Sequence, residues 1–329
     1  MRIVFRGNFQ RDLPPDVPPW STESHLAASL ELLGHEVVRN HEQTDDWAFT
    51  LRQAENADLF VWTSTWDYAT AWPKAEAFRS IRYLSDRTPT VAVHLDVFWR
   101  LTREWQIREN AMFRCRWVFT ADGDSDHLWE KEGIDHHWMP PGIFEPDAVD
   151  GTPRDEFRSD VAFVGSWQRY AHPEHWPQRR AMLERLTDRY RRGDRVRFWP
   201  RDGEPAVRGQ ALNDLYASVK VAVGDSCVTH PGARNYWSDR VPETIGRGAF
   251  LVHPAIPGLV EMLPEGMGVA YFPPGDLDAM VDTVDWWLAH DDEREEARRK
   301  GQAFVREHHS YTARMRQVLE TVEAAGAWR

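Results

Sequence analysis

The chain contains only two cysteines among its 329 residues, Cys115 and Cys227, and they lie far apart without metal-ligand spacing. A disulfide framework is therefore not expected. No stretch approaches the ~20 apolar residues that a membrane-spanning helix needs. The opening run 2–5 looks like a strand and lacks the apolar core of a signal peptide. Together these absences predict a soluble, cytoplasmic protein without a transmembrane segment.

Positive charge is also scarce, because the net charge is -12 and most of the excess acid lies early in the chain. Residues 1–150 carry 15 Lys and Arg against 25 Asp and Glu, whereas the remainder is nearly balanced. An acidic first half argues against broad binding of nucleic acid, which needs a basic surface. The second half is the better host for an anionic ligand. The 17 tryptophans are compatible with a sugar or nucleoside partner, but most are expected to fill core positions.

Strand-like and helix-like segments alternate twice along the sequence. The first half has apolar runs at 3–5, 58–63, 90–95 and 117–120, with helical patterns at 22–33, 72–84 and 99–113 between them. After a polar break at 150–160 the alternation resumes, and a charged helical segment closes the chain. This rhythm predicts parallel strands with crossover helices, that is, an α/β protein of two Rossmann-like domains.

A short motif near position 240 has the chemistry to bind a phosphate. Arg240 and Glu243 are three residues apart, and Pro242 suits the first turn of a helix that Gly246 and Gly248 end. A guanidinium can bind phosphate oxygens through two N–H groups, and a carboxylate can accept from a ribose diol. The alternative is an ordinary salt bridge beside a helix C-cap.

The segment 236–320 resembles the C-terminal half of GT-B glycosyltransferases, especially the spore-maturation-type group close to family four. The resemblance rests on this Arg-x-x-Glu helix, on Pro257-Gly-Leu-Val-Glu261 and on the tail His309-Ser-Tyr-Thr-Ala-Arg314. It implies a GT-B fold, with two Rossmann-like domains facing across a cleft. Residues 1–152 would form the acceptor domain and 153–307 the nucleotide-sugar donor domain, while a final helix at about 308–329 packs back on the first.

The resemblance also implies a donor site on the second domain. Glu243 would contact the ribose, and a glycine loop after strand 161–164 would lie against the diphosphate with Arg169, and with Arg179 as a further cation. Family-four enzymes usually carry two glutamates separated by seven residues; Glu243 fits the second, but Asn235 stands in place of the first, which puts the usual contact with the donor sugar in doubt. The predicted nucleotide site comprises Gly165, Ser166, Arg169, Arg240, Glu243 and Thr244, and the predicted sugar site comprises Asn235 and Tyr236.

In the first half, His94 and Asp96 end a predicted strand, which is where ligands bind in open α/β sheets. The resemblance implies a hydrogen bond from His94 to the sugar. Asp96 is either a base toward the acceptor or a residue that orients His94. Gly7, Asn8 and Glu23 are predicted to line the acceptor site.

The sequence thus predicts a glycosyltransferase that moves a sugar from a UDP- or GDP-linked donor to an acceptor hydroxyl. The resemblance implies retention of configuration, with inversion as the alternative if Asp96 is a true base. It also implies that no bound metal or other cofactor is needed, and His136, His137, His172 and His175 lack convincing partner sets. The alternatives are a sugar-nucleotide epimerase of the same fold and a non-catalytic binding protein. The acceptor is not identified; a nucleic acid is not expected, although a modified base stays open.

Overall fold

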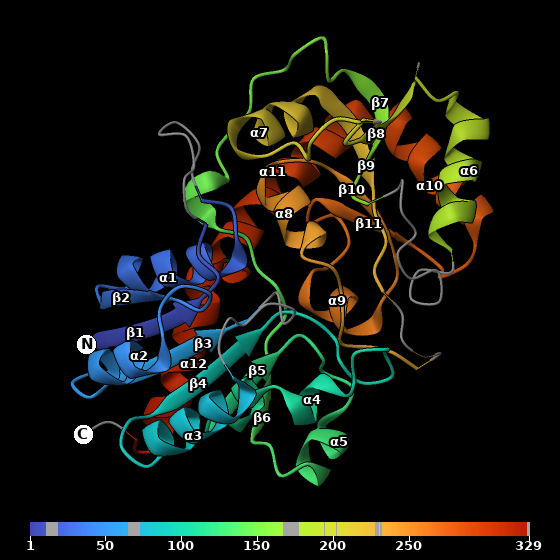
Figure 1. Cartoon of the computed structure of the whole chain (residues 1–329). Helices are drawn as coiled ribbons and strands as arrows, with labels where there is room; N and C mark the ends of the chain where they lie inside the picture. The colour runs from blue at the N-terminus through green and yellow to red at the C-terminus, as the bar shows by residue number, and fades with distance from the viewer. Residues whose placement is uncertain are drawn as a thin grey trace. The chain divides into compact units, whose positions relative to one another are not determined.

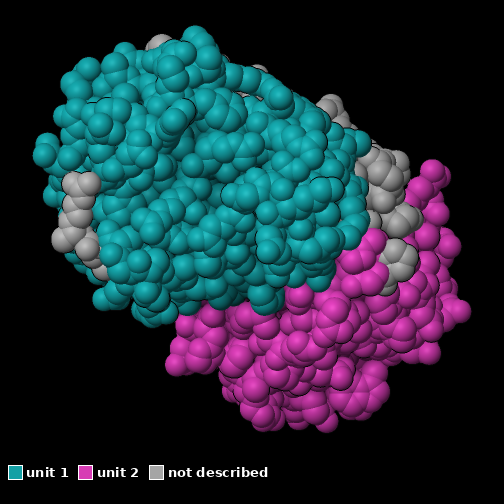
Figure 2. Space-filling view, turned by 90° about the horizontal axis from the view of Figure 1, so that it is seen from below, with its two compact units in different colours: residues 1–140, 311–329 teal, residues 141–310 magenta. Residues whose placement is uncertain are grey.

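The computed structural model describes residues 1–10, 19–64, 73–166, 178–193, 195–201, 203–227, 230 and 232–327. The chain divides into two compact units, coloured separately in Figure 2. Unit 1 comprises residues 1–140 and 311–329, and unit 2 comprises residues 141–310. Within the described part of the chain, no helix has the length and apolar character to cross a membrane.

Unit 1 is built on a six-stranded sheet in the order β2-β1-β3-β4-β5-β6, with every pair parallel. Its strands are β1 (Arg2–Gly7), β2 (Glu36–His41), β3 (Leu59–Thr63), β4 (Thr90–His94), β5 (Trp117–Thr120) and β6 (His136–Trp138). Its helices are α1 (Thr22–Leu32), α2 (Trp47–Ala54), α3 (Lys74–Ser85), α4 (Gln106–Glu109), α5 (Asp126–Lys131) and α12 (Tyr311–Ala324), with a 3₁₀ turn at Ala111–Arg114 (Figure 1).

The central strands of unit 1 are apolar on both faces because helices cover both faces. All residues of β3 and β4 are buried. Helices α2 and α3 contribute Trp47, Ile81 and Leu84 to the core on one face. Helix α1 lies over the other face, where a Cβ added to Gly7 would come within 2.9 Å of the Glu23 side chain.

Unit 2 contains a five-stranded sheet in the order β11-β10-β9-β7-β8, again parallel throughout. Its strands are β7 (Ser159–Val164), β8 (Val196–Trp199), β9 (Val219–Val223), β10 (Leu251–Pro254) and β11 (Val269–Phe272). Its helices are α6 (Arg179–Tyr190), α7 (Gly209–Ser218), α8 (Arg240–Gly246), α9 (Pro257–Met262), α10 (Leu277–Ala289) and α11 (Asp291–His308), with a 3₁₀ turn at Glu145–Asp147. Apolar residues of α6 and α10 pack on one face of this sheet.

The two parallel α/β sheets confirm the predicted fold class, but one predicted helix is wrong. The stretch 99–113 forms only the short α4 and the following 3₁₀ turn. Asn110 adopts an extended conformation (φ -101°, ψ 122°), and its side chain accepts a hydrogen bond from the Met112 N–H at 2.9 Å. An asparagine that caps the next turn in this way interrupts the helix.

The last helix belongs to unit 1, where α12 packs against α1. Arg314 is buried and donates from Nε to the carbonyl of Pro140 at 2.8 Å, which ties α12 to the last residue of the first segment of unit 1. Burial lowers the pKa of Arg314 to about 10, so its guanidinium is still charged at neutral pH.

Gly301, inside α11, provides a test of the packing in unit 2. A Cβ at this position would lie 2.5 Å from the backbone of Met267 and Gly268. Alanine usually stabilises a helix by about 1 kcal/mol relative to glycine. Here we expect the opposite sign: Gly301→Ala should lower the free energy of unfolding by about 1–3 kcal/mol, because the backbone must move. Urea unfolding measures this, with exposed Lys300→Ala as the control; a more stable Gly301→Ala variant would contradict the packing.

Candidate active site

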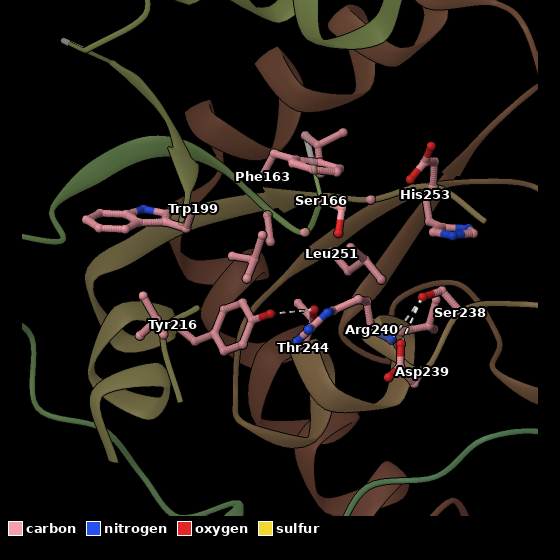
Figure 3. Close-up of a pocket in the computed structure, with 18 of the residues that line it drawn as sticks. Phe163, Ser166, Trp199, Tyr216, Ser238, Asp239, Arg240, Thr244, Leu251 and His253 are labelled. Atoms are coloured by element: carbon pink, nitrogen blue, oxygen red, sulfur yellow. Dashed lines mark hydrogen bonds between the residues drawn. The ribbon is translucent and has the colours of Figure 1, made fainter. Parts of the chain in front are cut away.

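A cavity of about 520 Å³ opens at the carboxyl edge of the unit 2 sheet. The ends of four neighbouring strands contribute to its wall, which is the usual position of a ligand site in an open α/β sheet. It is lined by residues at and just after the strand ends (Phe163, Val164, Gly165, Ser166, Trp199, Pro200, Ala222, Val223, Gly224, Asp225, Leu251 and His253), by the segments 206–208 and 238–239, and by residues of the helices (Arg179, Tyr216, Arg240, Val241 and Thr244). Figure 3 shows most of them.

Arg240 lies on the cavity wall at the first position of α8, so this helix begins two residues before Pro242. It forms an ion pair with Glu243, one turn along the same helix. This carboxylate raises the pKa of Arg240 further above its usual value, so the guanidinium is a permanent cation. Glu243 also lies 3.8 Å from Nε of Arg247, and it is not among the residues that line the cavity.

Two hydrogen bonds hold the wall around Arg240 in place. The hydroxyls of Tyr216 and Thr244 are 3.0 Å apart, which joins α7 to α8 inside the cavity (Figure 3). The backbone N–H of Arg240 donates to the Ser238 hydroxyl at 3.3 Å. Of the predicted nucleotide-binding residues, Thr244 therefore lies beside Arg240 on the cavity wall.

The predicted glycine loop reaches the same cavity. Gly165 and Ser166 line it directly after β7, while Arg169 lies outside the described residues. The N–H of Gly165 already donates to the Trp199 carbonyl at 3.0 Å. This hydrogen bond holds β7 against β8. Because Gly165 has no side chain, a ligand can still come close to its backbone.

The two residues predicted for the donor sugar lie elsewhere in unit 2. Neither Asn235 nor Tyr236 is among the residues that line the cavity. A Cβ on Gly258 would meet the side-chain oxygen of Asn235 at 2.3 Å, so Asn235 packs against the start of α9. Within the described part of the chain, the wall of the cavity is formed by other side chains.

Among these side chains is an ion pair that the sequence did not predict, formed by Arg179 and Asp225. Arg179 begins α6 and Asp225 follows β9, and both line the cavity. The guanidinium donates from Nε and Nη2 to the Asp225 carboxylate at 2.7–3.1 Å. The two residues are 46 positions apart, so no local motif could have joined them.

In unit 1, His94 ends β4 with its ring buried and packed edge-on against Phe98 at 4.7 Å. Burial lowers the pKa of His94 to about 4, so the imidazole is neutral at pH 7. Among the residues that the structure describes, none forms a hydrogen bond with its Nδ1. Asp96 forms an ion pair with Arg103 at 2.9 Å.

The residues predicted for the acceptor site surround the end of β1. Gly7 is that strand's last residue, Asn8 follows it half-buried, and Glu23 is buried on α1. Sequence reasoning missed Glu42, which follows β2 and is 1% exposed. Its carboxylate accepts from the Trp62 indole N–H at 3.2 Å, and burial raises the pKa of Glu42 to about 7.

The raised pKa of Glu42 gives a pH test of this buried edge. A carboxyl whose pKa is higher in the folded state than the usual 4.5 stabilises the fold below that value and loses the contribution as pH rises through 7. Between pH 5 and pH 8 the free energy of unfolding of the wild type should therefore fall by about 2 kcal/mol more than that of Glu42→Gln. Denaturant titrations at both pH values measure this, with Glu36→Gln on β2 as an exposed control. If the free energy of unfolding depended on pH equally in wild type and Glu42→Gln, the raised pKa of Glu42 would be contradicted.

Among the described residues, no three histidine, cysteine, aspartate or glutamate side chains gather in a way that could hold a metal ion.

Comparison with known proteins gives a family match and several structural matches. Residues 166–320 match a family described as glycosyl transferase-like. No curated protein matches the chain in sequence. An alpha-glucosyltransferase in complex with UDP-glucose and DNA containing an abasic site is 10% identical, with a TM-score of 0.66 over 98% of this chain and 99% of that chain.

Two further structures resemble the chain over nearly its whole length. HepE from Anabaena, in complex with UDP and glucose, has a TM-score of 0.60 at 12% identity, covering 98% of this chain and 100% of its own. Sucrose-phosphate synthase from Thermosynechococcus elongatus has a TM-score of 0.57 at 13% identity, covering 99% of each chain. At such low identity these matches show the fold alone, and the fold is the GT-B fold that the resemblance implied.

Proposed function

We propose that the unit 2 cavity binds a UDP-linked sugar for transfer to an acceptor hydroxyl. The chain has the GT-B fold and carries a glycosyltransferase domain at residues 166–320. The observation that carries the proposal is the position of Arg240. Its permanent positive charge lines a cavity at the carboxyl ends of parallel strands, inside the segment that matches the family. The choice of UDP over GDP follows the similar structures that contain UDP or UDP-glucose.

The leaving diphosphate gains negative charge during transfer, and fixed cations nearby lower the barrier most effectively. Arg240 is proposed to meet that charge, held in place by Glu243 and by the contacts of α8. Trp199 and Tyr216 back the wall of the same cavity and are 2% and 0% exposed, so they shape it without offering an open ring face. Glu243 stays a candidate for the ribose hydroxyls through its position beside Arg240.

His94 and Asp96 are proposed to serve the transfer step. A neutral imidazole can donate a hydrogen bond to a sugar hydroxyl or accept one. Because Asp96 is paired with Arg103, we propose that it orients the strand end and that the leaving phosphate deprotonates the acceptor. This assignment corresponds to retention of anomeric configuration, with Arg240 compensating the charge of the leaving diphosphate and no metal required.

The test is incubation of the purified chain with UDP-glucose, UDP-galactose and their GDP counterparts, without an acceptor and then with candidate hydroxyl acceptors. We expect slow release of UDP without an acceptor and faster release with a suitable one, unaffected by EDTA. An epimerised nucleotide sugar would identify the epimerase alternative. Binding without turnover of any donor would identify a non-catalytic binding protein.

A further inference from the structure

Arg179 and Asp225 both line the cavity, and each compensates the charge of the other. The two side chains are only 12% and 11% exposed. Nε and Nη2 of Arg179 both donate to Asp225, and Nη1 donates to the Ser166 carbonyl at 3.1 Å. All three nitrogens of the guanidinium are thus engaged, in a fixed orientation on the cavity wall.

Such a pair is a poor site for a diphosphate. A phosphate oxygen that approached Arg179 would also approach the Asp225 carboxylate, and like charges repel strongly in a partly buried setting. The positive and negative charges of the pair cancel, so little net attraction for an anion is left. Arg240 differs in its hydrogen-bonded partner: Glu243 does not line the cavity and also lies near Arg247, although the carboxylate of Asp239 lines the cavity with Arg240.

The same pair is well suited to a neutral ligand that is rich in hydroxyls. A carboxylate has more acceptor positions than one guanidinium fills, and a hydroxyl can donate to it without bringing charge. Hydrogen bonds to ionised groups are stronger than those between neutral groups. Gly224, next to Asp225, has no side chain to block the approach, and it lies on the same wall.

Resting on the proposed function, we propose that Arg179 and Asp225 bind the hydroxyls of the donor's sugar and make the site selective for neutral hexoses over sugars that carry a carboxylate. The pair would supply the sugar contact that the sequence assigned to Asn235 and Tyr236, neither of which lines the cavity. A uronic acid would bring its carboxylate against Asp225, while Arg179 is already neutralised. Arg179 is accordingly a sugar-binding residue and not a phosphate-binding cation.

The experiment is calorimetric titration of UDP, UDP-glucose and UDP-glucuronate into wild type and Asp225→Asn. Wild type should bind UDP-glucose more tightly than UDP, and UDP-glucuronate at least tenfold more weakly than UDP-glucose. In Asp225→Asn, affinity for UDP should stay within twofold of wild type or rise. The variant should bind UDP-glucose no more tightly than UDP. The difference in affinity between UDP-glucose and UDP-glucuronate should become smaller than in wild type. Asp285→Asn is the matched control, because Asp285 pairs with Arg189 of the same helix at 2.6 Å and does not line the cavity.

The outcomes separate this inference from the proposed function. Equal loss of affinity for UDP and UDP-glucose in Asp225→Asn would overturn the inference while leaving UDP binding established. If Asp225→Asn does not fold, the wild-type data suffice: equal affinity for UDP-glucose and UDP-glucuronate would overturn the inference. Failure of wild type to bind UDP at all would overturn the proposed function, and this inference with it.

Discussion

Replacing Arg240 with alanine should weaken binding of UDP by about ten- to a hundredfold. A hydrogen bond to a charged group contributes about 1.5–3 kcal/mol, and 1.4 kcal/mol corresponds to a factor of ten in affinity. Arg240 lines the cavity and is a permanent cation, so its removal takes away charge that no change of pH restores. Titration calorimetry with UDP measures the loss.

Arg234→Ala is the control for that experiment. Arg234 belongs to the same unit, is exposed and pairs with Glu261 at 2.7 Å, and it does not line the cavity. Its removal should leave affinity for UDP unchanged within twofold. Glu243 keeps a neighbouring cation in Arg247, so Arg240→Ala should retain the far-ultraviolet circular dichroism of the wild type. Unchanged affinity in a folded Arg240→Ala variant would count against the diphosphate assignment.

Replacing His94 with alanine should have a different signature, a loss of turnover without loss of donor affinity. We expect kcat to fall by roughly a hundredfold or more, which is the usual contribution of a positioned polar group in a transfer step. Affinity for UDP should stay within twofold of wild type, because the cavity and His94 belong to different units. Release of UDP from UDP-glucose, with and without acceptor, measures kcat.

The pH profile adds an independent check on His94. Since the pKa of His94 is lowered to about 4, the neutral imidazole persists at mildly acidic pH. Activity should therefore show no loss attributable to His94 as pH falls from 8 to 5, and should decline toward pH 4. Exposed His127→Gln on α5 is the control. An activity transition near pH 6.5 that disappears in His94→Ala would show that the ring titrates normally, against this account.

The sequence predicted the architecture well where the pattern was long and apolar. Strands β3, β4 and β5 are continuous buried runs, and the structure has them within a residue or two of the predicted bounds. The edge strands β6 and β11 were not predicted. β6 is only three residues long, with the polar sequence His-His-Trp, and β11 has four residues, so neither gives a periodic signal.

The candidate site could be predicted only where its residues are neighbours in the sequence. Arg240, Glu243 and Thr244 lie on one short helix, so their spacing was visible as a motif. The Tyr216–Thr244 contact joins residues 28 positions apart, and the Arg179–Asp225 pair joins residues 46 apart. Such pairs form only when the chain returns to the sheet edge through a crossover helix. A local sequence pattern does not indicate which distant residues will then be in contact. Glu42 is similar, because its raised pKa depends on burial that its sequence neighbours do not reveal.

The measurement that addresses the central claim most directly is a crystal structure of the chain with bound UDP. The account predicts the diphosphate in the cavity at the carboxyl edge of the unit 2 sheet, with at least one phosphate oxygen within hydrogen-bonding distance of the Arg240 guanidinium. UDP bound elsewhere on the chain, or an empty cavity in crystals grown at saturating UDP, would contradict it.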